Sequence, residues 1–302
     1  MIYLLPVLSG ILWGSVGIFV RTLTELGMDS YTIASSRLMV AACVMALVIF
    51  FYNKALFRIK IRDIWVFAVG GVFGMLGVLL AYNESVKEVT LSLAAVLLSM
   101  SPIFVLIFAA IFFKEKITGK KLGCMLLALT GCILVSGVFE SDSGMQWTVG
   151  GIGFGILAAV CYALYSLISK VAVKKEYHAF TTTFYCMAII AIVLIPVTDW
   201  GCLGRITADG GVKMIIFLLL HAVCTSVCPY VFYTLALNYM EAGKASILAA
   251  GEPVAAMIFG FVFFAERPTF LAIMGLVCTT TALIIFSKPE KRDGGNKKCQ
   301  EN

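Results

Sequence analysis

Charge is scarce in this chain of 302 residues. Asp, Glu, Lys and Arg make up 13% of it, against about 25% in ordinary soluble domains, and it has two histidines. Hydrophobic residues make up 61%, and the mean hydropathy is +1.00. This composition excludes a soluble globular domain. It predicts an all-α integral membrane protein, because a helix satisfies its own backbone polar groups within lipid.

Side chains that carry out catalysis are also few. All six aspartates lie outside the apolar runs or at their edges, and neither H-E-x-x-H nor G-x-S-x-G occurs. An intramembrane enzyme needs facing carboxylates, a Ser–His pair or metal-ligand histidines inside its spans. Most of the ten cysteines fall within apolar runs, which favours small buried side chains over disulfides or a metal framework. We therefore expect no enzyme, no cofactor and no metal site.

Apolar runs long enough to cross a bilayer alternate with short polar connections. Only the tail 288–302 is polar throughout, and no soluble domain is inserted. The expected transmembrane helices number ten and cover residues 3–20, 31–52, 64–82, 90–113, 120–138, 148–169, 179–198, 213–237, 244–264 and 269–286.

The basic residues are distributed unevenly about these runs. With the N-terminus in the cytoplasm, 17 of the 23 Lys and Arg fall on the cytoplasmic side, five on the other side, and Arg37 within a span. The positive-inside rule then predicts a multi-pass protein of the cell membrane, inner or plasma, with both termini cytoplasmic. Short basic clusters between spans indicate topology and not a nucleic-acid partner.

The two halves of the chain resemble each other. Residues 82–118 align without gaps on 233–269 with ten identities in 37 positions, among them Pro102 with Pro253 and Glu115 with Glu266. We expect a first five-helix repeat over 1–140, a second over 148–287, and a polar cytoplasmic tail over 288–302. Because five is odd, the second copy must cross the membrane in the opposite sense. Such inverted repeats are typical of transporters with a midplane site, although a purely structural duplication leaves the same trace.

Several of these features occur together in one known family. They are Trp13-Gly14 in the first span, an Arg early in the second, and the pattern P-x(12)-E closing both repeats, from Pro102 and from Pro253. From Leu8 to Ser287 the chain resembles the EamA branch of the drug/metabolite transporter superfamily. The resemblance implies a ten-helix carrier with a central cavity lined by helices 1–4 and 6–9. Family members export or import amino acids, other metabolites and toxic compounds.

Two ionisable residues lie well inside spans, where charge is costly and marks candidate functional groups. At 1.5 Å per residue, Arg37 lies about 9 Å below the external surface, Glu252 about 13 Å from the cytoplasmic one, and about 8 Å separates them along the normal. Arg37 either anchors a substrate carboxylate or phosphate or snorkels as a structural residue. Glu252 either carries a proton or substrate, or is a structural partner for Arg37.

The residues around these charges complete the candidate site. Pro102 and Pro253 predict a helix break in each repeat, preceded by Ser101 in the first and Glu252 in the second. Aromatic side chains could stack against a substrate or simply pack in the core; these are Trp13, Tyr82, Tyr162, Tyr165 and Tyr233. Glu115 and Glu266 are expected to cap helix ends or form gate salt bridges, and His221 to be a hydrogen-bonded packing residue.

The function that these features predict is secondary-active transport of a small metabolite, an amino acid or related organic solute. Export is one direction that the resemblance allows, and a proton is a candidate coupling partner alongside the solute and the lipid bilayer. The alternatives are a non-transporting polytopic membrane protein, a channel, and an intramembrane enzyme. The sequence lacks the charge rings or filter-like loops of a channel.

Overall fold

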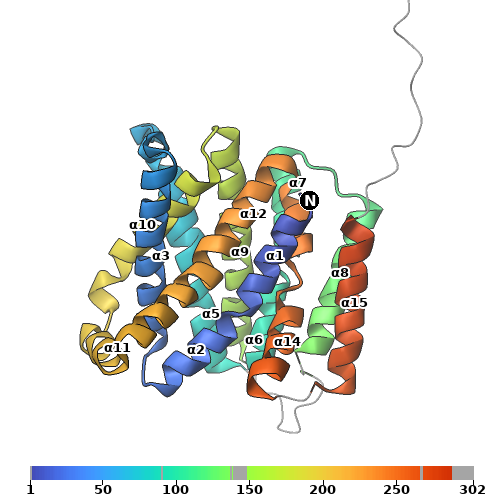
Figure 1. Ribbon diagram of the computed structural model, residues 1–302. Helices are drawn as coiled ribbons and strands as arrows, with labels where there is room; N and C mark the ends of the chain where they lie inside the picture. The colour runs from blue at the N-terminus through green and yellow to red at the C-terminus, as the bar shows by residue number, and fades with distance from the viewer. Residues whose placement is uncertain (1, 90, 137, 139–147, 266–267, 288–302) are drawn as a thin grey trace, which may run out of the picture.

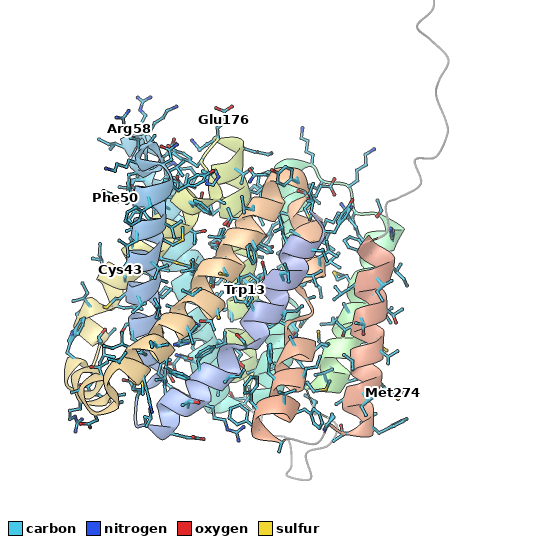
Figure 2. All side chains as sticks on the ribbon, in the orientation of Figure 1. Trp13, Cys43, Phe50, Arg58, Glu176 and Met274 are labelled. Atoms are coloured by element: carbon cyan, nitrogen blue, oxygen red, sulfur yellow. The ribbon has the colours of Figure 1, made fainter. Side chains whose placement is uncertain are left out.

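The computed structural model describes residues 2–89, 91–136, 138, 148–265 and 268–287. Within these ranges the chain is helical and has no β-strand. The helices form one bundle, and the N-terminus and the C-terminal end of α15 lie at the same end of it (Figure 1). We call this the terminal end; Arg58 and Glu176 mark it in Figure 2, and Met274 lies toward the opposite, distal end.

The first half of the chain contains helices interrupted near their middles. Their bounds are α1 Leu4–Gly14, α2 Val16–Glu25, α3 Ser30–Tyr52, α4 Ile64–Ala68, the π-helix η3 Val69–Leu76, α5 Gly77–Glu88, α6 Leu91–Ser99, α7 Ser101–Phe113 and α8 Gly119–Val135. Two short 3₁₀ turns, Lys54–Phe57 and Ile61–Asp63, connect α3 to α4 at the terminal end.

The second half has the same kinds of interruption. Its helices are α9 Val149–Lys174, α10 Ala179–Leu194, α11 Trp200–Ala222, the π-helix η5 Val223–Val227, α12 Cys228–Tyr239, α13 Ala242–Ala249, α14 Glu252–Phe264 and α15 Phe270–Ser287, with a 3₁₀ turn at Ile195–Val197. Helix starts carry side-chain caps: Asp29 accepts from the Tyr31 N–H at 2.9 Å, and Thr148 from the Gly151 N–H at 2.9 Å.

Eight helical segments among the described residues are long and apolar enough to cross a membrane. They are Leu4–Glu25, Ser30–Tyr52, Ile61–Glu88, Leu93–Phe113, Val149–Lys174, Ala179–Val197, Trp200–Tyr239 and Ala242–Phe264. The remaining two predicted runs correspond to shorter helices, the 17-residue α8 and the apolar α15, which pack side by side. The chain is therefore a multi-pass, all-helical membrane protein.

Some predicted boundaries were wrong in an informative way. The third and sixth spans were expected to end at 82 and 169, but α5 continues to Glu88 and α9 to Lys174. Helical hydrogen bonding continues through these polar last turns, so hydropathy marks the apolar part and not the end of the helix. The eighth span was expected to begin at 213. Its helix begins at Trp200 and bends at Gly211, whose φ of 54° is left-handed.

Helix bounds recur at a spacing of 151 residues, the offset of the sequence alignment. The start and end of α5, 77 and 88, become 228 and 239 in α12, and the ends of α7 and α14 are 113 and 264. The two π-helices end at 76 and 227. The residues that terminate α7 and α14, Lys114 and Ala265, both adopt positive φ, 56° and 53°.

Two glycines set how closely α1 approaches the α13–α14 junction. A Cβ on Gly10 would lie 2.5 Å from the Ala249 carbonyl oxygen, and one on Gly14 would lie 2.7 Å from that of Glu252. No larger residue fits at such distances, because real Cβ atoms do not approach backbone this closely. α1 therefore packs directly against the backbone that carries Glu252.

Candidate functional site

Two of the spans, Leu93–Phe113 and Ala242–Phe264, are each made of two helices that meet inside the bundle. In one, α6 ends at Ser99, and Ser101 and Pro102 open α7; in the other, α13 ends at Ala249, and Glu252 and Pro253 open α14. Each proline occupies the first turn, where its missing N–H removes no intrahelical bond. Ser101 is buried and Glu252 is partly buried. The arrangement puts a hydroxyl at one junction and a carboxyl at the other.

An aromatic cluster occupies the middle of the bundle. Trp13, near the end of α1 and labelled in the middle of the bundle in Figure 2, has its ring centroid 5.2 Å from that of Tyr230, 5.7 Å from Tyr233 and 5.8 Å from Tyr162. Tyr165 packs edge-on against Tyr230 at 5.2 Å. Edge-to-face contacts at these separations are favourable beyond the area they bury. Four of the five predicted aromatic site residues thus meet in one cluster.

Hydrogen bonds fix two of these rings and leave polar atoms of the cluster unused. The Tyr233 and Ser166 hydroxyls are 2.7 Å apart, and those of Tyr165 and Thr234 are 3.3 Å apart. The Trp13 indole Nε1 is buried and has no hydrogen-bond partner among the residues that the structure describes. A buried donor without a partner costs free energy, so this N–H is suited to a ligand atom.

Arg37 lies on α3. Its Nε atom is buried without a hydrogen-bond partner in the described ranges, and its charge interacts with Tyr230 and His221. His221 is fully buried and stacks on Phe19 with ring centroids 5.1 Å apart. The expectation of a hydrogen-bonded histidine was wrong, since neither ring nitrogen has a partner within the described residues.

Glu252 is the first residue of α14 and is partly buried. Its charge interacts with Tyr82, Tyr162 and Tyr230. No ion pair involving Glu252 or Arg37 occurs in the part of the chain that the structure describes. The salt bridge considered between these two residues is therefore not formed. Tyr230 interacts with both charges.

Tyr230 was missed by the sequence analysis. It lies one helical turn before Tyr233 on α12, directly after Pro229, and its ring touches both Trp13 and Tyr165. The i, i+3 spacing of the two tyrosines would have indicated a shared helix face.

Glu115 follows the end of α7. Its carboxylate accepts the N–H groups of Ala242 at 3.0 Å and Gly243 at 3.3 Å, so it caps α13 instead of its own helix. Lys170 Nζ donates to the carbonyls of Leu237 and of Met240, the latter at 2.7 Å. These two charges hold both sides of the α12–α13 turn. Glu266, the matching residue of the second repeat, lies outside the described residues.

Hydrogen bonds between distant parts of the chain also occur at the distal end. The Thr198 hydroxyl donates to Ser35 Oγ at 2.7 Å, and the Asp199 N–H donates to Thr32 Oγ1 at 2.9 Å. Ser85 Oγ donates to the Gly151 carbonyl at 2.8 Å. Contacts between distant parts of the sequence therefore close the bundle at both ends of the aromatic cluster.

Two pockets in the described part of the chain lie outside this cluster. One, of about 340 Å³, opens at the terminal end, and the other, of about 10 Å³, lies beside Pro102 and Ala250. Trp13, Tyr165 and Tyr233 are 7%, 2% and 0% exposed, so ring packing fills the centre. No group of three metal-ligating side chains occurs among the described residues, and the nine cysteines in those ranges are free thiols.

Comparison with known proteins gives consistent relatives. An uncharacterized transporter of Archaeoglobus fulgidus is 26% identical over 89% of this chain and 90% of its own length. The pseudopaline exporter CntI of Pseudomonas aeruginosa is 27% identical over 74% of this chain and 75% of its own. A solved crystal structure aligns with a TM-score of 0.75 over 95% of this chain and 96% of its own, at 14% identity. This last likeness shows a shared fold.

The family match covers both halves of the chain. Residues 1–137 and 149–288 each match the EamA-like transporter family, and the gap between the matches falls between α8 and α9. The family match covers nearly the whole chain. It agrees with the multi-pass helical bundle and with the similar transporters, and it identifies the family. The chain belongs to the EamA-like transporter family of the drug/metabolite transporter superfamily.

Proposed function

We propose that this protein is a secondary-active transporter that moves an amino acid or a related organic solute across the cell membrane by alternating access. Membership of a transporter family supports transport as such. The relative named as an exporter favours the outward direction. Both termini are cytoplasmic in this proposal, because the basic residues gather at the terminal end.

The proposed architecture is ten transmembrane helices in two inverted repeats, over 1–140 and 148–287. α8 and α15 serve as the fifth and tenth spans, peripheral and packed on each other. The recurrence of helix bounds, π-helices and left-handed end residues at a spacing of 151 supports the repeat. Two related halves give two nearly equivalent conformations, each open to one side.

The observation that carries the proposal is the pair of charges at the aromatic cluster. Arg37 from the first repeat and Glu252 from the second have no ion-pair partner among the described residues, and both interact with Tyr230. A guanidinium binds a carboxylate in a bidentate manner, and a carboxylate binds an ammonium group. A zwitterionic amino acid presents both groups, and the rings of Trp13 and Tyr162 would flank it.

Glu252 has a second role in this proposal, that of the coupling group. A carboxyl group in apolar surroundings favours its neutral form unless a cation is near, so it exchanges a proton for the substrate ammonium. The backbone that carries it begins a helix and packs against Gly14 of α1. A change in the charge of Glu252 would therefore act directly on the contact between α14 and α1, which belongs to the first repeat.

Transport in proteoliposomes tests the proposal. Vesicles loaded with a mixture of radiolabelled amino acids are followed for efflux with and without a pH gradient. We expect Arg37→Lys to weaken substrate affinity, and Glu252→Gln to abolish the effect of the pH gradient. Arg205→Lys and Glu176→Gln make the same changes at exposed positions and should transport like the wild type.

Two results would contradict the proposal. Unchanged affinity in Arg37→Lys removes that residue from the binding site, and unchanged pH dependence in Glu252→Gln removes the proton role. Alternating access is tested separately by cysteines placed at Ser101 and Gly251. If neither changes the side from which it is labelled when substrate is added, the protein does not alternate and is a non-transporting membrane protein or a channel.

A further inference from the structure

A basic pocket lies at the terminal end of the bundle, outside the site described above. Its volume is about 340 Å³, and it is lined from the ends of five helices or their adjoining turns. Among the residues that the structure describes, three lysines line it, Lys120 and Lys121 from the first turn of α8 and Lys244 from that of α13, and one carboxylate, that of Glu241. Basic side chains therefore outnumber acidic ones in the described part of the lining.

The lysines of this pocket make specific hydrogen bonds and ring contacts. Lys121 Nζ pairs with Glu241 and also donates to the Lys116 carbonyl at 2.7 Å, so its charge is compensated. Lys244 Nζ donates to the Tyr3 hydroxyl at 3.2 Å and lies 4.5 Å from the centre of that ring. Lys120 Nζ lies 6.0 Å, and Lys244 Nζ 5.9 Å, from the centre of the Phe286 ring.

The aromatic rings in its lining distinguish this pocket from an ordinary cluster of solvent-exposed lysines. Phe286, at the end of α15, receives both ammonium groups and is itself buried. Tyr3 and the exposed Tyr239 complete the wall. Two lysines whose ammonium groups converge on one ring, beside tyrosine hydroxyl donors, form a site for a compact anion with several oxygen acceptors.

We propose that this pocket binds a phosphate group, namely that of an anionic phospholipid in the cytoplasmic leaflet. Two observations favour a lipid over free phosphate. The pocket opens beside the ends of α8 and α15, the proposed peripheral helices, and its wall includes apolar Ile2 as well as aromatic rings that suit the glycerol and upper acyl region. Basic pockets at the cytoplasmic ends of transmembrane helices are typical sites for such headgroups.

Bound lipid would join parts of both halves of the chain. Lys120 belongs to α8 in the first half and Lys244 to α13 in the second. A headgroup held by both therefore stabilises the closed terminal end, next to the turn that Glu115 and Lys170 hold. The site acts on this end of the bundle without touching the aromatic cluster.

The test uses the full-length protein in nanodiscs of phosphatidylcholine alone or with phosphatidylglycerol. Thermal unfolding and native mass spectrometry report stabilisation and retained lipid. We expect phosphatidylglycerol to stabilise the wild type, with binding weakened about fivefold by Lys244→Gln and more by the double change Lys120→Gln with Lys244→Gln. Lys54→Gln removes an exposed charge from the same end outside the pocket and should behave like the wild type.

A third arm adds inorganic phosphate to protein in phosphatidylcholine discs. Stabilisation by millimolar phosphate that equals that of phosphatidylglycerol, and that is lost in the double variant, would overturn the lipid assignment in favour of a soluble phosphate. Equal retention of phosphatidylglycerol by the wild type and a folded double variant would overturn the site itself. Because neither readout involves transport, these outcomes are independent of the proposed function.

Discussion

Gly10 is the position at which one methyl group tests how α1 packs against the junction that carries Glu252. A Cβ there would lie 2.5 Å from the Ala249 carbonyl oxygen and 3.1 Å from its carbon. Ordinary contacts between such atoms are at about 3.5 Å, so Gly10→Ala forces the two helices about 1 Å apart. The obstacle is backbone, which cannot rotate away as a side chain can. Overpacking of this kind costs about 1–3 kcal/mol.

Gly17→Ala is the matched control for this change. Gly17 lies in α2 of the same span, and a Cβ there would meet nothing within 4 Å. Both variants gain the helix propensity of alanine, about 1 kcal/mol, so the difference between them isolates the clash. Thermal unfolding of both, in one detergent and without substrate, should give Gly17→Ala at or above the wild type and Gly10→Ala several degrees lower. Equal melting temperatures would refute the close packing.

Three further changes test other contacts of the bundle. Tyr233→Phe leaves the buried Ser166 hydroxyl without its partner and should cost about 1–3 kcal/mol, whereas Tyr52→Phe, at a 68% exposed ring, should cost little in the same unfolding assay. Lys170→Met removes the donor to two α12 carbonyls and should lower stability by about 1.5–3 kcal/mol; a melting curve like that of Lys54→Met would contradict it. Tyr230→Phe keeps the ring but removes the hydroxyl that interacts with the charges of Arg37 and Glu252, and should reduce efflux while the melting temperature stays near that of the wild type; normal efflux would exclude that hydroxyl from the site.

Predictions from the sequence were most reliable where the lipid bilayer restricts the backbone to one kind of structure. Apolar runs in the bilayer have to be helical, so the all-helical class and the family could be inferred from residues alone. Prolines at 102 and 253 likewise sit at the start of helices within the fourth and ninth spans. Helix ends were less predictable, because α5 and α9 extend into polar turns that hydropathy counts as loops.

Contacts between distant helices could not be inferred from spacing. Depth along the membrane normal gave about 8 Å between Arg37 and Glu252, which left a salt bridge open. Depth along the membrane normal does not give the separation of the two side chains in the plane of the membrane. In the structure they form no salt bridge, and both charges interact with Tyr230. The partner of Glu115 was equally out of reach, since its carboxylate caps a helix that begins 127 residues later in the chain. Such contacts are set by how helices pack and not by local pattern.

The helix bounds match between the two halves of the chain, but the residues of the candidate site do not. This difference bears on the proposed mechanism. Helix bounds coincide at a spacing of 151 down to the residue, as in α5 and α12, yet the groups at equivalent helix starts differ: Ser101 opens α7 and Glu252 opens α14. Two conformations of similar energy require matching scaffolds, which a symmetric set of helix breaks provides. Coupling to a charge requires only one acid, because a second carboxylate at position 101 would repel the first in the same apolar region. Helix bounds that match in the two halves, together with an acidic residue at one of the two equivalent helix starts, would suit the proposed carrier with one central site.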